Sequence, residues 1–349
     1  MPEQVYRGTV LAGENFEPIQ AAVIVENGII TGIEEETAVP PVWISPAFFN
    51  AHTHLGDTVA MDCASNGGDL AALVTPPNGL KHRILAATPV EQLIAGMKAS
   101  IRTMRESGTA GFADFREGGI EGVRALQEAL EDEPCLPIIF GREGGEREAH
   151  GIGISSVRDV TDAEEQVRRA RASGKLVAFH AGEKDPDDID GALAYDPDLL
   201  VHCTHATRDQ LRRIADAGIA IAVCVRSNWI LGVTRGAEHP PLQTMADLGC
   251  TVYLGTDNVM FVQPDMLREM CFCDAVSPLP PEWILRAAVG GASLGGGRSF
   301  DIQIGNPAHF VLIDARRSAL QYSTNPIASI VRRVGGKEIL ETVICRDCE

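Results

Sequence analysis

The amino-acid sequence predicts an α/β fold, a (β/α)8 TIM barrel with a small discontinuous β-sandwich domain formed by the N- and C-terminal segments. In the middle of the 349-residue chain, short apolar runs alternate with amphipathic stretches, which is the pattern of a parallel sheet with crossover helices. Both ends instead show short β-rich runs separated by turns. We therefore expect a barrel at residues 46–300 and a second domain made from residues 1–45 and 301–349.

Eight apolar runs in the middle region are the expected barrel strands, because eight βα units in about 250 residues match the usual size of such a barrel. The fourth run, 151–155, contains two glycines and would suit a loop equally well. The expected strands are 46–50, 110–114, 136–140, 151–155, 176–179, 199–202, 220–225 and 251–255. The expected helices are 89–106, 123–130, 162–172, 208–217 and 242–248.

The terminal segments read as strands of the smaller domain. Near the N-terminus the β-rich runs are 5–11, 21–25 and 29–33, and Asn27-Gly28 before the last run is a hairpin signal. Near the C-terminus the expected strands are 310–313, 329–334 and 340–344.

Composition limits the possible partners and the compartment. The chain has 48 Asp and Glu against 30 Lys and Arg, a net charge of −18, which argues against a nucleic-acid or anionic-membrane surface. The apolar runs fall short of the roughly 18 residues of a membrane span. The N-terminus lacks the features of an export signal, and nine cysteines without a framework spacing favour a reduced cytoplasmic location. Cys345 and Cys348 form a lone C-x-x-C pair, which we interpret as two free thiols.

Metal-binding residue types stand at the ends of four expected strands. His52 and His54 close the first strand, and because alternate side chains share a face, both can point toward the barrel axis. The active sites of barrel enzymes are built at this rim, so histidines and carboxylates on several strand ends indicate one metal site. The other strand ends contribute His180, Glu183, His202, His205 and Asp257.

The order of these motifs, His-x-His, His-x-x-Glu, His-Cys-x-His and Gly-Thr-Asp, resembles the amidohydrolase superfamily. The resemblance is strongest to the branch that contains cytosine deaminase, guanine deaminase and the triazine hydrolases. Residues 44–50 resemble the family's entry into the first strand, and residues 305–314 resemble its return into the β domain. Nearly the whole chain is therefore covered.

The resemblance implies that His52, His54, His180 and Asp257 bind one divalent metal ion. Zn²⁺ is the metal that the family suggests, while Fe²⁺ accepts the same ligands. Two-metal members use a carboxylated lysine on the fourth strand, and none of the five lysines lies there. A metal-bound hydroxide would attack the substrate, with Glu183 and Asp257 moving protons and His202 stabilising the tetrahedral centre.

Several residues are expected to contact the substrate. The family pattern favours His202, and His205 either shares this role or supports His202 from the loop. Ser227 and Asn228 match a Ser-Asn pair of many relatives. Arg226 departs from the neutral residue that is usual there, and it either meets a substrate group or pairs with an acidic neighbour.

The long loop after the first strand, residues 55–82, has two interpretations. It contains Asp57 and Lys81 and could form a substrate lid, or its end could be a solvated helix start at Leu80. Residues 114–117 and 142–146 follow other strands on the same rim and indicate no particular substrate.

The sequence thus predicts an amidohydrolase that acts on a non-peptide carbon–nitrogen bond of a small molecule. Deamination of an aminated heterocycle such as a purine, pyrimidine, pterin or triazine is the first hypothesis. Hydrolysis of a cyclic or linear amide is the second, and a non-catalytic metal-binding relative is the third. No nucleic acid or membrane is expected as a partner, and a homo-oligomer is possible.

Overall fold

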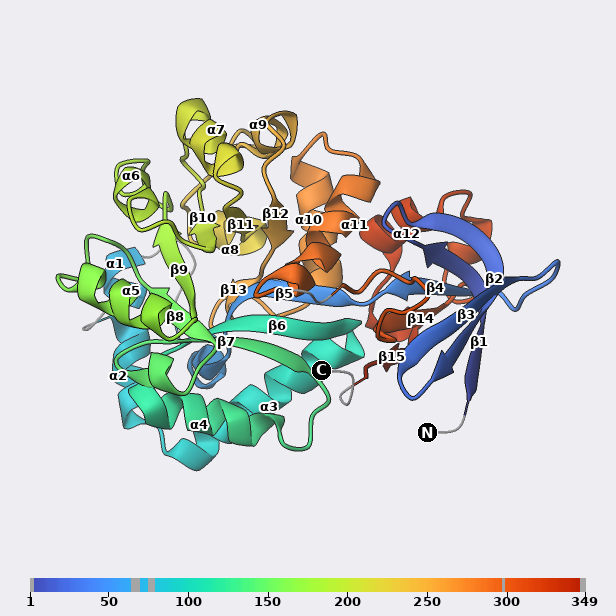
Figure 1. The fold of residues 1–349 in the computed structure, drawn as a ribbon, viewed down its shortest axis with the longest axis horizontal. Helices are drawn as coiled ribbons and strands as arrows, with labels where there is room; N and C mark the ends of the chain where they lie inside the picture. The colour runs from blue at the N-terminus through green and yellow to red at the C-terminus, as the bar shows by residue number, and fades with distance from the viewer. Residues whose placement is uncertain (1–2, 64–69, 75–78, 297–298, 346–349) are drawn as a thin grey trace.

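The computed structural model describes residues 3–63, 70–74, 79–296 and 299–345, which form two sheets with surrounding helices (Figure 1). The larger sheet has nine parallel strands in the order β12-β11-β10-β9-β8-β7-β6-β5-β13. Its strands are β5 (Phe48–His54), β6 (Thr109–Arg116), β7 (Leu136–Gly141), β8 (Gly151–Ile154), β9 (Leu176–Ala181), β10 (Leu199–His202), β11 (Ala220–Val223), β12 (Val252–Leu254) and β13 (Asp257–Asn258).

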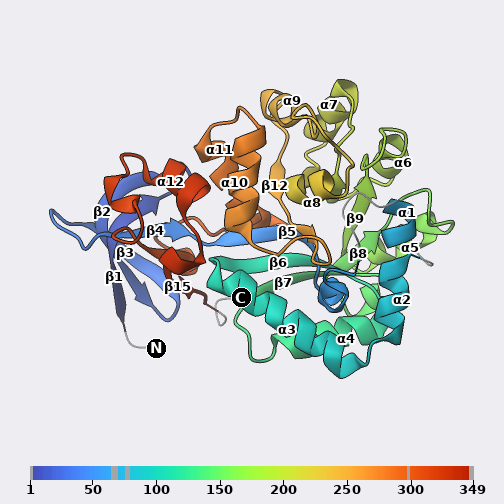
Figure 2. The same ribbon diagram turned by 180° about the vertical axis from the view of Figure 1, so that it is seen from behind.

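The nine strands curve into a half-barrel with helices along its outer side, as the two opposite views show (Figures 1 and 2). Because one face of the sheet packs against helices and the other faces the interior of the half-barrel, β6, β10 and β11 are buried throughout. This burial explains the continuous apolar runs of the sequence. The ambiguous fourth run is a strand, since β8 pairs in parallel with both β7 and β9.

The helices lie between successive strands, as the amphipathic patterns predict. Those that follow the predicted ranges are α3 (Val90–Glu106), α4 (Gly119–Leu130), α5 (Ala163–Ala172), α7 (Arg208–Asp216) and α9 (Leu242–Asp247). The remaining α-helices of the central region are α1 (Leu70–Val74), α2 (Leu80–Ala87), α6 (Ile189–Leu193), α8 (Val225–Ile230), α10 (Met266–Val276) and α11 (Pro281–Val289). A 3₁₀ helix, η1 (Leu55–Ala60), follows β5 directly.

The smaller sheet joins the two ends of the chain. Its order is β15-β14-β4-β1-β2-β3, and β14 from the C-terminal part pairs antiparallel with β4 from the N-terminal part. The strands are β1 (Gln4–Ala12), β2 (Glu17–Glu26), β3 (Ile29–Glu35), β4 (Val42–Pro46), β14 (Phe310–Asp314) and β15 (Ile339–Val343). All neighbours are antiparallel except β1 and β4. The described strands from the two ends of the chain form one six-stranded sheet, so the expected sandwich of two facing sheets is wrong.

The expected strand at 329–334 is also wrong, because this segment belongs to helix α12 (Pro326–Arg333). Asn325 caps the helix by accepting a hydrogen bond from the Ala328 N–H, and proline occupies the first helical position. The buried residues Ile330 and Val331 are β-branched, which explains why the segment resembles a strand in sequence.

Two further findings concern membrane-spanning helices and the cysteines near the C-terminus. None of the helices in the described ranges has the length and apolar character needed to cross a membrane. Cys345 is disulfide-bonded, so the expectation of a free thiol is wrong at this position, and Cys348 lies outside the described residues.

Candidate metal and active site

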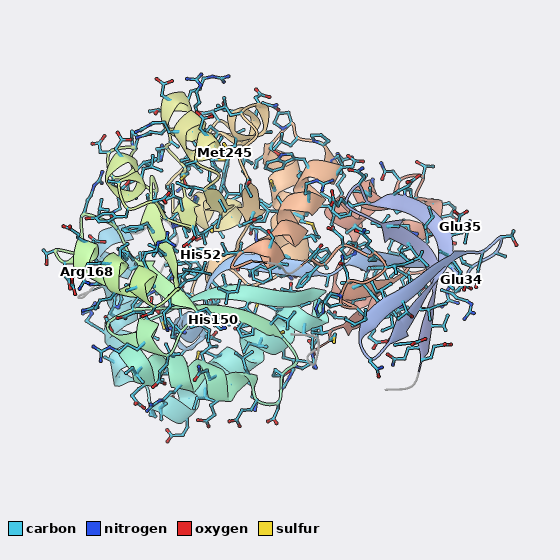
Figure 3. The ribbon with its side chains drawn as sticks, viewed as in Figure 1. Glu34, Glu35, His52, His150, Arg168 and Met245 are labelled. Atoms are coloured by element: carbon cyan, nitrogen blue, oxygen red, sulfur yellow. The ribbon has the colours of Figure 1, made fainter. Side chains whose placement is uncertain are left out.

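The last residues of β5 place two imidazoles on the inner side of the half-barrel. His52 and His54 are two residues apart on the strand, and their ring centroids lie 4.9 Å apart. Figure 3 shows His52 inside the molecule, whereas Arg168, Glu34 and Glu35 lie at its surface. The alternation of a strand therefore produces the predicted pair.

Strand β13 brings a carboxylate beside this pair. Asn50 fixes the register, because its Nδ2 donates to Thr256 Oγ1 at 2.8 Å and its Oδ1 accepts from the Thr256 N–H at 3.0 Å. At the preceding residue only glycine fits, since a Cβ on Gly255 would lie 2.7 Å from Cβ of His52. Asp257 follows with a positive φ of 63°, a strained conformation that is typical of functional sites.

The distances between these side chains fit ligands around a shared cation. Oδ1 of Asp257 lies 3.2 Å from Nε2 of His52 and 3.6 Å from Nε2 of His54. Despite the 3.2 Å separation, Nε2 of His52 forms no hydrogen bond within the described part of the chain, because the donor geometry is wrong. Ligand atoms about 2.0–2.2 Å from a tetrahedral ion are roughly 3.3–3.6 Å from one another. The donor set therefore fits a divalent metal ion.

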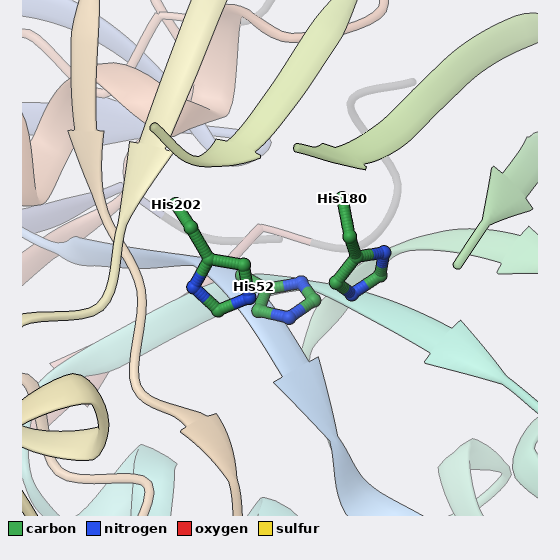
Figure 4. A group of neighbouring side chains, drawn as sticks. All are labelled: His52, His180 and His202. Atoms are coloured by element: carbon green, nitrogen blue, oxygen red, sulfur yellow. The ribbon is translucent and has the colours of Figure 1, made fainter. Parts of the chain in front are cut away.

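Two more histidines reach the same place from β9 and β10. His180 lies 4.9 Å from His52 between ring centroids, and His202 lies 5.8 Å from it. Figure 4 shows the three rings gathered together, with His52 between the other two. Nδ1 of His180 is 3.0 Å from the Ile154 carbonyl oxygen, which can only accept, and this contact is shorter than the 3.3 Å to Nη2 of Arg142, so we assign the proton to this nitrogen. Its Nε2 is buried, is free to bind a metal, and has no hydrogen-bond partner among the residues described.

The structure thus places the four predicted ligands and His202 in two groups that share His52. Two groups have ligand atoms within 4.8 Å of one another: His52 with His54 and Asp257, and His52 with His180 and His202.

Burial sets the protonation states that metal ligands need. It lowers the pKa of His52 to about 4 and that of His54 to about 3, and it lowers the pKa of His180 well below the usual value. For Asp257 burial acts in the opposite direction, but contact with His52 outweighs it and holds the pKa well below its usual range. At neutral pH the site offers neutral imidazoles and an ionised carboxylate, the forms that bind metal.

Glu183 lies above these groups in a small cavity of about 80 Å³. Its Oε2 is 4.0 Å from Nε2 of His202, and burial raises its pKa. The cavity is also lined by His54, His180, His202, Asp257 and Asn258, besides other residues, among them Arg142 and Lys81. An adjoining cavity of about 160 Å³ shares His180 and Glu183 with it. A small molecule in these cavities would therefore contact Glu183 and His202.

The other predicted substrate contacts are placed less favourably. Ser227 donates a 2.6 Å hydrogen bond to Oδ2 of Asp257, so it orients this carboxylate. Arg226 pairs with the buried Glu269, its Nε lying 2.6 Å from Oε2, and it does not line the described cavity. Of the two interpretations of Arg226, the acidic neighbour is therefore correct.

Neither His205 nor Asn228 lines the described cavity. Nε2 of His205 is 3.1 Å from the Val233 carbonyl oxygen, and its ring packs against His239. Nδ2 of Asn228 donates to Thr204 Oγ1 at 2.6 Å. His202 alone of the two competing histidines therefore borders the cavity in the described part of the chain.

The sequence reasoning missed a group of buried charges beside His54. Lys81 is 2% exposed, so the solvated helix start is wrong for this residue. Its Nζ lies 2.9 Å from Oδ2 of Asp57 and 2.8 Å from Oε1 of Glu117. Burial favours the neutral form of Glu117, but Lys81, His54 and Arg116 outweigh it and hold the pKa well below its usual value. No pattern in the sequence separates these charges from ordinary surface residues.

Comparisons with known proteins agree with this geometry. The profile of the amidohydrolase family matches residues 43–174, and that of adenosine deaminase matches residues 150–291. A putative aminohydrolase of Methanothermobacter thermautotrophicus is 33% identical over 97% of this chain and 97% of its own length.

Solved structures share the fold. An adenosine deaminase from Xanthomonas campestris with bound zinc superposes with a TM-score of 0.77 at 18% identity, over 98% of this chain and 91% of its own. Guanine deaminase from C. acetobutylicum, with guanine bound in its active site, gives a TM-score of 0.76 at 15% identity over 99% of each chain. The chain belongs to the amidohydrolase superfamily and is a deaminase-like hydrolase of carbon–nitrogen bonds.

Proposed function

We propose that this protein is a metal-dependent hydrolase that deaminates an aminated heterocycle. The observation that supports this proposal most strongly is the convergence of His52, His54, His180 and Asp257 beneath a cavity that also contains Glu183. A structural metal site has no need of an unligated carboxylate beside it. The pocket therefore favours catalysis over a purely structural role for the metal.

In this proposal His52, His54, His180 and Asp257 hold one divalent ion. The ion would be Zn²⁺, which the solved adenosine deaminase contains, with Fe²⁺ as the alternative for the same ligands. When bound, it would lower the pKa of a water molecule to near neutrality and so supply the nucleophile.

The side chains around the cavity would carry out the remaining steps. Asp257 would accept the proton of the attacking water, and Ser227, which donates to its other oxygen, would keep it oriented. Glu183 would donate its proton to the ring nitrogen, then take the proton of the newly added hydroxyl group and pass it to the departing ammonia, and the proton held by Asp257 would restore Glu183. His202 would donate a hydrogen bond to the tetrahedral centre, stabilising it more than the planar substrate.

We also infer that the half-barrel is a closed eight-stranded barrel in which β12 and β13 are two parts of one strand. The two residues between them support this inference, because Gly255 N–H donates to the Val223 carbonyl of β11 and Thr256 N–H donates to the His52 carbonyl of β5. The division into a barrel at residues 46–300 and a discontinuous β domain at 1–45 and 301–349 is proposed on the pairing of β4 with β14.

The test is ammonia release by the zinc-loaded protein, with purines, pyrimidines, pterins and triazines as substrates. Adenosine and guanine, which are named in the two solved relatives, come first. We expect ammonia from at least one aminated heterocycle. Ring opening of a cyclic amide without ammonia would support the amide hydrolase instead. Bound zinc with neither activity would favour the non-catalytic relative.

A further inference from the structure

We infer that Glu117 is a positioning residue for metal binding, which holds His54 with its Nε2 toward the metal, and that Lys81 of helix α2 fixes Glu117 in place. This inference rests on the proposed assignment of His54 as a metal ligand. It concerns residues outside that ligand set, because Glu117 follows β6 and Lys81 follows the long loop after β5.

The contacts of the His54 ring indicate which of its two nitrogen atoms carries the proton. Nδ1 of His54 lies 3.1 Å from Oε1 of Glu117 and 3.2 Å from the Phe115 carbonyl oxygen, and both are closer than Nζ of Lys81 at 3.4 Å. Both oxygens accept hydrogen bonds, so the proton of the neutral imidazole belongs on Nδ1. The lone pair on Nε2 then faces Asp257 and the proposed metal. A carboxylate behind a ligating histidine fixes its tautomer and orientation and increases its basicity.

The position of Glu117 is determined by three cations. Its Oε1 contacts Nζ of Lys81 at 2.8 Å and Nη1 of Arg142 at 3.3 Å, and its Oε2 accepts from Nη2 of Arg116 at 2.8 Å. The Glu117 side chain is only 6% exposed, so water hardly screens these interactions. The backbone is confined as well, because a Cβ on Gly122 would lie 1.9 Å from the Glu117 carbonyl oxygen. The carboxylate therefore has little freedom to leave His54.

Lys81 is the member of this cluster that comes from the loop after the first strand. It is as buried as a core residue and bridges Glu117 to Asp57 of η1. A lysine is buried at such a place only if paired, and here its two partners lie on different elements. Helix α2 is thereby tied to the metal-facing histidine through two side chains.

The variants that test this inference differ in how many buried charges they remove. Replacing Glu117 alone with Gln leaves Lys81 with one partner fewer and destabilises the fold as well as the site. The double variant K81M/E117Q removes one charge of each sign and keeps similar side-chain shapes, although it also takes away the lysine partner of the buried Asp57. E133Q is the control, because the buried Glu133 carboxylate accepts from Arg102 at 3.0 Å but does not belong to the described metal site.

Zinc affinity is measured by competition with a chelator, and the thermal midpoint of each zinc-free variant is recorded beside it. We expect E117Q and K81M/E117Q to bind zinc about 10–100-fold more weakly than wild type, while the thermal midpoint shows that each variant is folded. E133Q is expected to retain wild-type affinity. A folded double variant with wild-type zinc affinity would overturn the inference, since the Phe115 carbonyl would then suffice. Failure of the wild-type protein to bind zinc would instead overturn the proposed function.

Discussion

Among the residues of the site, Glu183 is held less firmly by neighbouring side chains and backbone groups than the metal-facing residues are. Asp257 and His180 are each fixed by a hydrogen bond, from Ser227 and to Ile154 respectively. Glu183 is partly exposed, at 24%, and its Oε2 lies 4.0 Å from Nε2 of His202, beyond hydrogen-bond distance. This freedom suits a group that must accept a proton on one side of the substrate and deliver it on the other.

Replacement of Glu183 by Gln tests this role. The amide keeps the shape of the side chain but cannot carry the proton, so we expect turnover to fall about 10²-fold or more. Metal content should be unchanged, because Glu183 is outside the proposed ligand set. Ammonia release and metal analysis on the same sample check both expectations. Undiminished turnover would refute the role of Glu183.

The residues that the sequence did and did not reveal differ in a simple physical respect. His52 and His54 were predictable because a strand places alternate side chains on one face, and Asp257 because strand ends meet at one rim. Lys81 and Glu117 were not predictable. Each is a charged residue in a polar stretch. The two residues are 36 positions apart in the chain, and their burial depends on a contact that only the fold creates.

At the level of elements, helices α8 and α10 are joined by a buried ion pair. Arg226 of α8 is 11% exposed, and its Nε donates to Oε2 of the fully buried Glu269 of α10. The same helix α8 carries Ser227, which orients Asp257. The pair therefore supports the site from outside the cavity.

Arg226→Met should lower stability and leave substrate affinity nearly unchanged. Removing one partner strands the buried Glu269 carboxylate, which costs about 3 kcal/mol of the free energy of unfolding. Urea unfolding measures this loss, and the double variant R226M/E269Q, in which no charge is left unpaired, should recover most of it. A raised KM at unchanged stability would show instead that Arg226 binds substrate.

The type of an element was predictable from the sequence where one hydrophobic pattern dominates. The prediction was wrong where a helical pattern and strand-favouring residues coincide. The buried parallel strands read as continuous apolar runs, whereas the glycine-containing run of β8 suited a loop equally well, and its pairing with β7 and β9 is visible only in the fold. In α12, Ile327, Ile330 and Val331 lie on a helical face, yet their β-branched side chains also suit a strand. The distinguishing signal was the cap at Asn325-Pro326, just before the segment.

For the whole molecule, an ion held by His52, His54, His180 and Asp257 would join β5, β9 and β13, which are far apart in sequence. Binding to the folded state alone stabilises that state by mass action. In the metal-free protein, buried nitrogen atoms of His52 and His180 lack hydrogen-bond partners among the described residues, which is unfavourable.

Removal of the metal should therefore lower the thermal midpoint. Zinc at one hundred times its dissociation constant contributes about 2.7 kcal/mol to stability. We expect a chelator to lower Tm by several degrees and added zinc to restore it, as measured by calorimetry with metal analysis. An unchanged Tm in a sample shown to have lost its metal would contradict this expectation.

The most direct test of the central claim is anomalous X-ray scattering from crystals of the zinc-loaded protein at the zinc absorption edge. The proposal predicts one strong peak, coordinated by His52, His54, His180 and Asp257, with Glu183 beside it but not bound to it. A peak coordinated by His202 in place of Asp257, or the absence of a peak between β5 and β13, would contradict the proposal.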